Sequence, residues 1–333
     1  MKKCISLILA LCLSLTLFAG CGAAQDAAPE TTAAPATEPA PTVSQVAIDA
    51  LDGKKVMFIG NSYTYWGNCV INVQNNILSQ SERTGDQGLF YQLCKANGID
   101  VEVTNWVFGA HNFTDIMSEE CLCEDSKCEG QNHLAHLTDP YFDYVAIQCF
   151  YETEYAGDLI SHLTPAMELF REANPNVKFL LMVPHMGYER NFKWIPEIQA
   201  AVDADMLVCN WGLMVTDIIQ KTVTVPGAQQ PYSRPTFVIS KDEKDGHHQN
   251  MLAGYLTALM AYCAITGDSA VGQPYDFCDD PTIHPNFDLD AYQAKYYTYE
   301  PYTNFVEVMR SEADMLGLQQ LVDRYLTKYN GEN

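Results

Sequence analysis

Short apolar runs alternate along the chain with segments whose apolar residues recur at helical spacing. The runs, which are typical of strands buried on both faces, are Lys54–Gly60, Val101–Phe108, Tyr144–Gln148, Lys178–Val183 and Thr236–Ser240. The helical segments span 89–94, 159–170, 211–219 and 252–263. This alternation predicts an α/β fold, a doubly wound, flavodoxin-like parallel sheet of five strands flanked by helices. Because such sheets bind ligands beyond the carboxyl ends of their strands, we expect the chemistry to come from residues that follow these runs.

The amino terminus carries a predicted export signal. Two lysines precede an apolar stretch, Ile5–Ala19, which is short for a membrane-spanning helix and typical of a secretory signal peptide. The stretch ends in Leu17-Phe18-Ala19-Gly20-Cys21, which resembles a bacterial lipobox. The resemblance implies that residues 1–20 are removed and that Cys21 is lipidated, which would hold an exported protein at the extracellular face of the cell membrane. A plain cleaved signal peptide and an uncleaved anchor helix are the alternatives.

The next segment is expected to be a disordered tether. Residues 21–48 are dominated by Ala, Thr and Pro and contain no aromatic residue, so they cannot form a core. The remaining residues, 49–333, are predicted to form a single domain. It contains a Cys-rich loop at 119–136 and a helical C-terminal extension that begins at about residue 268.

The balance of charge excludes one class of partner. The chain has 42 Asp and Glu against 19 Lys and Arg, a formal charge of −23, and removal of Lys2 and Lys3 with the signal peptide makes it −25. Binding of nucleic acid requires a basic surface, so we expect no nucleic-acid partner. The same charge disfavours polyanionic substrates and favours neutral or cationic ones.

The first apolar run ends in Gly60-Asn61-Ser62. Gly60 allows a sharp turn, and Ser62 then stands at the carboxyl edge of the sheet near a helix start, where backbone N–H groups can face developing negative charge. Serine and asparagine are also ordinary turn and helix-cap residues. Taken alone, this segment is therefore a weak signal.

A second element lies far downstream, after the last apolar run. Asp245 precedes His248 by three residues, just before an apolar helical segment. A carboxylate in this place can hold the imidazole Nδ1–H and leave Nε2 to take a proton from a serine hydroxyl. We therefore predict a triad with Ser62 as nucleophile, His248 as base and Asp245 as orienting residue. The alternative gives these residues structural roles in a turn, a helix cap and a core or surface position.

Together, these segments resemble the SGNH/GDSL hydrolases. Gly60-Asn61-Ser62 is similar to the first block of the family and Asp245–His248 to its last block. Val107–His111 is similar to the second block, in which Gly109 supplies an oxyanion contact. The resemblance implies an SGNH-hydrolase-like fold and a serine esterase that requires no cofactor. It also implies that the N–H groups of Ser62 and Gly109 hold the oxyanion.

One block departs from the family pattern. The third block, Gly-x-Asn-Asp, is replaced at the end of the third run by Ile147-Gln148-Cys149. Gln148 is the expected substitute for the missing asparagine as an oxyanion donor, since its side chain carries an N–H group. Asn61 and His185, the latter just after the fourth run, are expected to contact the substrate.

The predicted substrate of the esterase is a small-molecule or glycan ester. A more specific hypothesis is that the protein is an esterase of the carbohydrate deacetylase type. Loss of one oxyanion donor without replacement costs about 10²–10³ in rate. The departure in the third block therefore leaves a second function open. In that alternative the protein is a surface solute- or glycan-binding lipoprotein with a degenerate SGNH-like site.

Seven cysteines of the predicted domain fall into two groups. Of 12 cysteines, two leave with the signal peptide and one is the predicted lipidation residue, so nine remain in the domain, and an odd number cannot all pair. Those in apolar segments are expected to be small buried hydrophobic residues: Cys94, Cys149, Cys209 and Cys263.

The second group lies in the polar Cys-rich loop. It consists of Cys121, Cys123 and Cys128, followed by His133 and His136. These residue types are zinc ligands, so a structural zinc site is one interpretation. Disulfides or free thiols are the other. The serine chemistry itself requires no metal.

Overall fold

The structure of the protein, a computed structural model, describes residues 43–65, 83–84, 88–108, 111–117, 134–148, 158–185, 194–238, 248–279 and 310–330. All of them belong to one compact unit, Pro41–Asn333. The strands are β1 (Lys54–Gly60), β2 (Arg83–Thr84), β3 (Val101–Val107), β4 (Tyr144–Gln148), β5 (Lys178–Met182) and β6 (Leu207–Cys209). The α-helices are α1 (Gln45–Leu51), α2 (Ser62–Tyr65), α3 (Leu89–Ala96), α4 (Phe113–Met117), α5 (Leu159–Ala173), α7 (Trp194–Asp203), α8 (Trp211–Ile219), α9 (Met251–Thr266) and α11 (Glu312–Asn330). Short 3-10 helices are η3 (Leu134–His136), η4 (Arg234–Thr236) and η6 (Asp276–Asp279).

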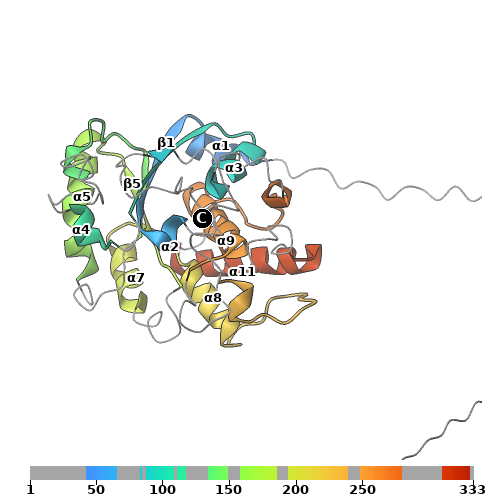
Figure 1. Ribbon diagram of the computed structural model, residues 1–333. Helices are drawn as coiled ribbons and strands as arrows, with labels where there is room; N and C mark the ends of the chain where they lie inside the picture. Colours follow the sequence, from blue (N-terminus) through green and yellow to red (C-terminus); the bar gives the residue numbers. More distant parts are fainter. Residues whose placement is uncertain are drawn as a thin grey trace, which may run out of the picture. The chain divides into compact units, whose positions relative to one another are not determined.

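The strands form one sheet in the order β2-β3-β1-β4-β5-β6 (Figure 1). Neighbours pair in parallel except for the two-residue edge strand β2, which runs antiparallel to β3. The parallel strands and their flanking helices confirm the predicted doubly wound sheet. Because β3 is added on one side of β1 and β4 on the other, the crevice at which such folds bind ligands lies beyond the ends of β1 and β4.

The sheet has five parallel strands as predicted, but the predicted position of the fifth was wrong. That strand is β6, whereas the described part of the run 236–240 contains the end of η4 and a single antiparallel bridge between Val238 and Gln249. Phe237 and Val238 are nevertheless buried, at 0% and 3% exposure, so the apolar character of the run reflects packing and not strand pairing. With three residues, β6 is too short to be recognised as an apolar run.

Helices cover both faces of the sheet. Figure 1 shows α4, α5 and α7 on one side and α1, α3, α9 and α11 on the other. α9 is the centre of the second layer, because it contacts β5 and β6 and is itself contacted by α1, α3 and α11. All 16 residues of α9 are buried. The described part of the predicted C-terminal extension contains η6 and α11, and α11 also packs against α8 and β6.

The ordered domain begins earlier than the predicted boundary at residue 49. α1 starts at Gln45, and Ser44 Oγ caps it by accepting a hydrogen bond from Ala47 N–H at 3.1 Å. Ala47 and Leu51, four residues apart on one helical face, are fully buried, so the end of the predicted tether joins the core. The signal peptide and the lipidation residue lie outside the described residues. Within the described segments, no helix combines the length and the apolar character that crossing a membrane requires.

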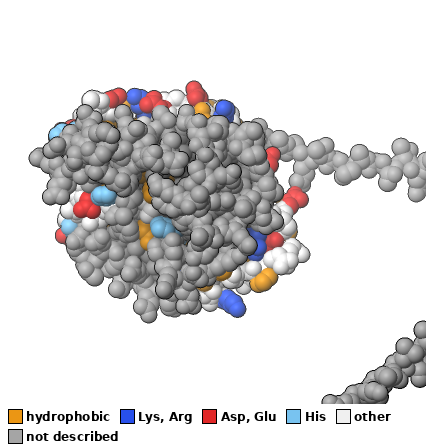
Figure 2. All heavy atoms as spheres, viewed as in Figure 1, with side chains coloured by type: hydrophobic (Ala, Val, Ile, Leu, Met, Phe, Trp, Pro, Cys, Tyr) orange, Lys and Arg blue, Asp and Glu red, His pale blue; other side chains and the backbone are white. Residues whose placement is uncertain are grey.

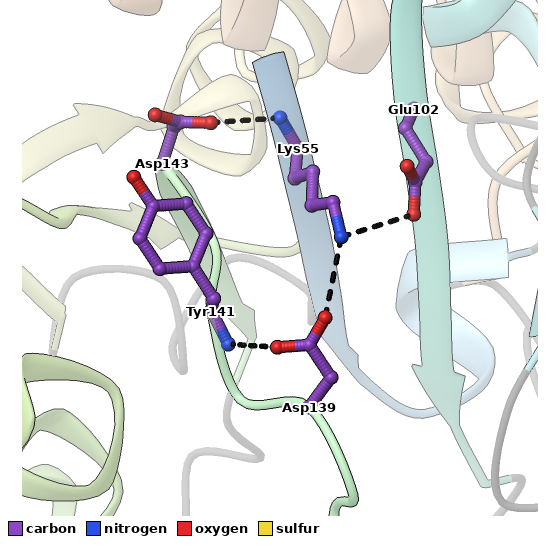
Figure 3. A network of polar contacts seen from close by, with 5 residues as sticks. All are labelled: Lys55, Glu102, Asp139, Tyr141 and Asp143. Carbon is purple, nitrogen blue, oxygen red and sulfur yellow. Dashed lines mark hydrogen bonds and ion pairs between the residues drawn. The ribbon is translucent and has the colours of Figure 1, made fainter. Parts of the chain in front are cut away.

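Polar contacts tie the strands together at the amino-terminal edge of the sheet (Figure 3). Lys55 N–H donates to Asp143 Oδ2 at 2.9 Å, and Lys55 Nζ lies 3.3 Å from Asp139 Oδ2 and 3.9 Å from Glu102 Oε1. The hydrogen bond to Asp139 raises the pKa of Lys55. The pKa of Asp139 is lowered, chiefly by the hydrogen bond from the Tyr141 N–H and to a smaller extent by the Lys55 ammonium. These contacts link β1 to β3 and to the segment before β4, at the end of the strands opposite Ser62.

Candidate active site

Ser62 lies where β1 turns into α2. The strand ends at Gly60, and Ser62 is the first residue of α2, with 7% exposure. Its Oγ lies 2.9 Å from Nε2 of His248, a residue 186 positions later in the chain. A serine hydroxyl in this contact can pass its proton to the imidazole ring as it attacks a carbonyl carbon.

The residues after His248 fix the position of its backbone. Gln249 forms the antiparallel bridge with Val238. Asn250 caps α9, because its Oδ1 accepts a hydrogen bond from Ala253 N–H at 3.1 Å. The imidazole is therefore attached to the start of the fully buried helix α9.

An aromatic ring packs over the imidazole. The centroid of the Tyr63 ring lies 5.4 Å from that of His248, with an angle of 33° between the two planes. Tyr63 is 4% exposed, so the packing also shields one side of the histidine from solvent. Asp245, the predicted orienting residue, lies outside the described residues, and its role stays a prediction.

Gln148, at the end of β4, touches the turn that carries the nucleophile. Its side chain is 2% exposed. The amide oxygen Oε1 accepts hydrogen bonds from Asn61 N–H at 3.2 Å and from Thr64 Oγ1 at 3.0 Å. The amide nitrogen Nε2 is buried and has no hydrogen-bond partner in the part of the chain that the structure describes. The side chain thus presents an unused donor at the carboxyl edge of the sheet.

Asn61 connects the nucleophile turn to the segment after β3. Its Nδ2 donates to the carbonyl of His111 at 2.9 Å, and its Oδ1 accepts from Tyr63 N–H at 3.1 Å. With both amide atoms engaged and 1% exposure, Asn61 holds the turn in place, while its predicted contact with substrate stays untested. Gly109, the second predicted oxyanion donor, lies outside the described residues.

His185 follows β5, and β4 separates β5 from β1. The imidazole is 2% exposed, and its Nδ1 lies 3.0 Å from Thr216 Oγ1. The hydroxyl of Thr216 donates to the carbonyl of Gly212 at 2.7 Å, so the ring nitrogen is the donor in its own contact with Thr216. The structure places His185 on the predicted edge of the sheet, packed against α8.

Three of the described cysteines are buried and chemically shielded. Cys94, Cys209 and Cys263 are free thiols, and burial raises the pKa of each, that of Cys209 to about 12. Since the thiolate is the reactive form, these residues are small hydrophobic groups, as predicted. Cys149 lies outside the described residues.

The Cys-rich loop is almost entirely outside the described residues. Of its predicted ligands only His136 is described; it is exposed at the end of η3, while Cys121, Cys123, Cys128 and His133 are not described. Among the described residues, no group of three or more His, Cys, Asp or Glu side chains could hold a metal ion. The zinc and disulfide interpretations of the loop both stay predictions.

Sequence reasoning missed three residues near the sheet edge. Tyr63 and Thr64 follow the serine directly, and their contacts depend on side-chain placement that spacing does not reveal. Asn210 follows β6, the strand that was not predicted. It is 1% exposed, and neither atom of its amide has a partner among the described residues. Recognition of β6 would have placed Asn210 at the same edge as Ser62.

Figure 2 shows the face that is viewed in Figure 1. Near the middle of this face, a histidine side chain reaches the surface beside hydrophobic side chains. The described acidic and basic side chains lie mainly toward the rim. The described part of this face therefore offers an imidazole among apolar and not among charged groups.

No family model and no curated protein sequence matches the chain. Solved structures do match. A catalytic mutant of Axe2, an acetylxylan esterase from Geobacillus stearothermophilus, has a TM-score of 0.42 and 15% identity, over 65% of this chain and 95% of that one. A second Axe2 mutant, described as an acetyl-xylooligosaccharide esterase from the same genus, has a TM-score of 0.41 and 16% identity, over 66% and 96%. A suggested SGNH hydrolase from Slackia heliotrinireducens has a TM-score of 0.37 and 12% identity, over 65% and 99%. All three TM-scores are below 0.5, so the chemistry assigned to this chain depends on its own residues.

Proposed function

We propose that the protein is a serine esterase in which Ser62 attacks an ester carbonyl and His248 acts as the general base. The observation that carries the proposal is the 2.9 Å contact between Ser62 Oγ and His248 Nε2. This contact joins residues 186 positions apart at the carboxyl edge of the sheet, where doubly wound folds bind their ligands. Structural roles in a turn and at a helix start would not require the side chains of Ser62 and His248 to be in contact.

The reaction is acyl transfer to serine and then to water. As Ser62 Oγ bonds to the carbonyl carbon, the hydroxyl proton passes to His248 Nε2 and the carbonyl oxygen becomes an oxyanion. Collapse of the tetrahedral intermediate breaks the ester C–O bond, and His248 returns the proton to the departing alcohol. A water molecule then attacks the carbonyl carbon of the acyl-serine and gives a proton to His248. Collapse of this second intermediate breaks the bond to Ser62 Oγ, which takes the proton back from His248, and the acid is released. Asp245 is proposed to hold the imidazole Nδ1–H throughout.

Three donors are proposed for the oxyanion: the N–H groups of Ser62 and Gly109 and the side-chain Nε2 of Gln148. The surroundings of Gln148 support its part, because its oxygen is engaged by Asn61 and Thr64 while its buried NH₂ group has no partner among the described residues. A buried donor without a partner costs free energy in the resting protein. The same donor stabilises a developing oxyanion without further reorganisation.

The proposed location is outside the cell, with a lipid on Cys21 that holds the protein at the extracellular face of the membrane. The proposed substrate is a neutral or cationic ester, since the formal charge of −23 disfavours a polyanion. Within that class we propose acylated carbohydrate, and no cofactor takes part in the reaction. A structural zinc ion in the Cys-rich loop is a separate proposal that metal analysis of the purified protein can test.

Turnover of 4-nitrophenyl acetate by the purified protein tests the proposal. We expect Ser62→Ala and His248→Ala each to lower kcat/KM by at least about 10³-fold, because the nucleophile and its base act as a unit. A fluorophosphonate should label the wild-type protein at Ser62. Ser269→Ala, which removes an exposed hydroxyl that donates to Asp323 on α11, is the matched control and should leave turnover unchanged. Absence of both turnover and labelling in the wild-type protein would contradict the proposal.

The binding hypothesis predicts a different set of results. A solute- or glycan-binding lipoprotein with a degenerate site would show no turnover in the wild-type protein. It would bind a glycan with an affinity that survives Ser62→Ala. The contact between Ser62 Oγ and His248 Nε2 favours the esterase, because a site that only binds has no need of a base beside a serine hydroxyl.

A further inference from the structure

We infer that Thr64 is a positioning residue that, together with the backbone N–H of Asn61, holds the Gln148 amide so that its NH₂ group and not its oxygen serves the oxyanion. This inference rests on the proposed function. Its structural basis is the hydrogen bond from Thr64 Oγ1 to Gln148 Oε1, 3.0 Å long, between two side chains that are 0% and 2% exposed.

Two donors meet on the same oxygen atom. Asn61 N–H, a backbone group that can only donate, lies 3.2 Å from Gln148 Oε1, and the hydroxyl of Thr64 donates to that oxygen as well. If the amide were turned over, its NH₂ group would face the Asn61 N–H, and two donors would oppose each other. The Asn61 N–H therefore sets which amide atom faces the turn, and the Thr64 hydroxyl adds the second contact that keeps Oε1 there and leaves Nε2 as the outward donor.

Thr64 differs from the threonines of the longer helices in its backbone contacts. Threonines in the longer helices donate their hydroxyl to the carbonyl four residues earlier: Thr164, Thr216, Thr257, Thr266 and Thr327. The carbonyl four residues before Thr64 belongs to Gly60, and it accepts from Phe108 N–H at 2.9 Å. Thr64 instead reaches a side chain 84 residues away. Thr257 also donates to a side chain, Gln249 Oε1 at 3.2 Å, but in addition to its backbone contact, whereas Thr64 contacts the proposed oxyanion donor in place of a local carbonyl.

The test compares Thr64→Val, which keeps the shape of the side chain and removes its hydroxyl, with Thr64→Ser, which keeps the hydroxyl. We expect Thr64→Val to lower kcat for 4-nitrophenyl acetate by about tenfold, the value of one net hydrogen bond, with little change in KM. Thr64→Ser should remain within about threefold of the wild type. An unchanged kcat in Thr64→Val would overturn the inference.

A double-mutant cycle separates positioning from a purely structural effect. In a Gln148→Leu background the amide is gone, so Thr64→Val should cause no further loss of kcat. A loss of the same size in both backgrounds would overturn the inference. Thr266→Val is the matched control, since it removes another buried threonine hydroxyl at the far end of α9 and should leave kcat unchanged.

A comparison by neutron crystallography, which distinguishes the amide oxygen from the amide NH₂ group, tests the inference without activity. In wild-type and Thr64→Ser crystals, the Gln148 oxygen should face Asn61 N–H, whereas in Thr64→Val the amide should rotate or take two orientations. A single unchanged orientation in Thr64→Val would overturn the inference. If the wild-type protein shows no Ser62-dependent turnover, the proposed function fails, and the amide orientation still shows whether Thr64 positions Gln148.

Discussion

Gly60 lets the side chains of Thr64 and Gln148 meet at the end of β1. A Cβ atom on this residue would lie 2.2 Å from Thr64 Oγ1, 2.9 Å from Gln148 Oε1 and 3.1 Å from Gln148 Cβ. These distances are shorter than ordinary contacts, so any larger residue must push the two side chains apart. The glycine of the first block is therefore needed for close approach, in addition to the turn that the sequence predicted.

Gly60→Ala is expected to impair the reaction more than the fold. Displacement of the Gln148 amide should lower kcat by about 10²–10³, the cost of one lost oxyanion donor. The free energy of unfolding should fall by about 1–3 kcal/mol, as for other overpacked sites. Turnover of 4-nitrophenyl acetate and urea unfolding of the same preparation measure the two effects.

Gly98→Ala is the matched control for Gly60→Ala. Gly98 has a φ of +70°, and a Cβ atom on it would meet no other atom within 4 Å, so alanine there is strained but does not clash. It should cost about 1–2 kcal/mol of stability and leave kcat unchanged. A Gly60→Ala protein with wild-type kcat would show that the proposed placement of Gln148 is wrong.

The residues of the site differ in how far the sequence could predict them. Ser62 and Gln148 were expected at one edge because the carboxyl ends of parallel strands lie side by side. The contact of Thr64 with Gln148 was not expected. It depends on the space left by Gly60 and on which backbone carbonyls already accept a hydrogen bond. Spacing predicts which residues approach the edge, and packing decides which atoms meet.

At the scale of elements, the strands differ in how clearly the sequence marks them. β1 and β4 have the predicted bounds, and β3 and β5 end one residue earlier than their runs. All four lie inside the sheet. In β1, β4 and β5 burial on both faces produces a continuous apolar run, whereas β3 exposes Glu102 among its apolar residues. β6 is a three-residue strand at the edge. The described apolar residues of the later run, Phe237 and Val238, are buried beside the start of α9. Length and apolar character alone therefore assigned the fifth strand to the wrong segment.

The start of α11 is held by one buried carboxylate. Asp314, 1% exposed, accepts hydrogen bonds from Ser311 Oγ at 2.6 Å, Tyr232 OH at 3.0 Å and Gln229 N–H at 3.1 Å. Burial alone would raise the pKa of Asp314, but these hydrogen bonds and the charge of Arg310 outweigh it and hold the pKa below its ordinary value of 3.8. The ionised carboxylate thus fastens α11 to the segment after α8.

The stability that Asp314 provides should depend on pH. Because its pKa is lower in the folded state than in the unfolded chain, the contribution is fully present above pH 3.8 and is lost as the pH falls through the folded-state pKa. Asp314→Asn should therefore lower the free energy of unfolding at pH 7 and have a smaller effect at about pH 3. Urea unfolding at both values measures the difference.

Glu312→Gln is the matched control for Asp314→Asn, since Glu312 is an exposed carboxylate in the same first turn of α11. It should have little effect at either pH, because an exposed charge near a helix start contributes only a few tenths of a kcal/mol. An Asp314→Asn effect that stays constant between pH 7 and about pH 3 would show that the carboxylate is not the group that holds the helix.

At the scale of the whole molecule, charge and the proposed lipid act in opposite directions. The chain from Cys21 onward carries a formal charge of −25, which an anionic membrane surface repels. The proposed tether, shortened to 21–42 because α1 begins at Gln45, would span about 25 Å as a coil, longer than the screening length of ~8 Å at physiological salt. The membrane surface would therefore repel the domain only weakly. Because both are negatively charged, electrostatic attraction would not anchor the protein.

Retention at the membrane should depend on Cys21 and not on salt. We expect the wild-type protein to stay in the membrane fraction of the cells that export it during a 1 M NaCl wash and to leave it in detergent, because a lipid chain is held by apolar burial and not by ion pairs. Cys21→Ser should release the protein from the membrane fraction while turnover of 4-nitrophenyl acetate stays the same. Cys94→Ala, which changes a buried core thiol, is the control and should remain membrane-bound. Release of the wild-type protein by salt, or retention of Cys21→Ser, would contradict lipid anchoring and favour a charge-mediated contact or an uncleaved anchor helix.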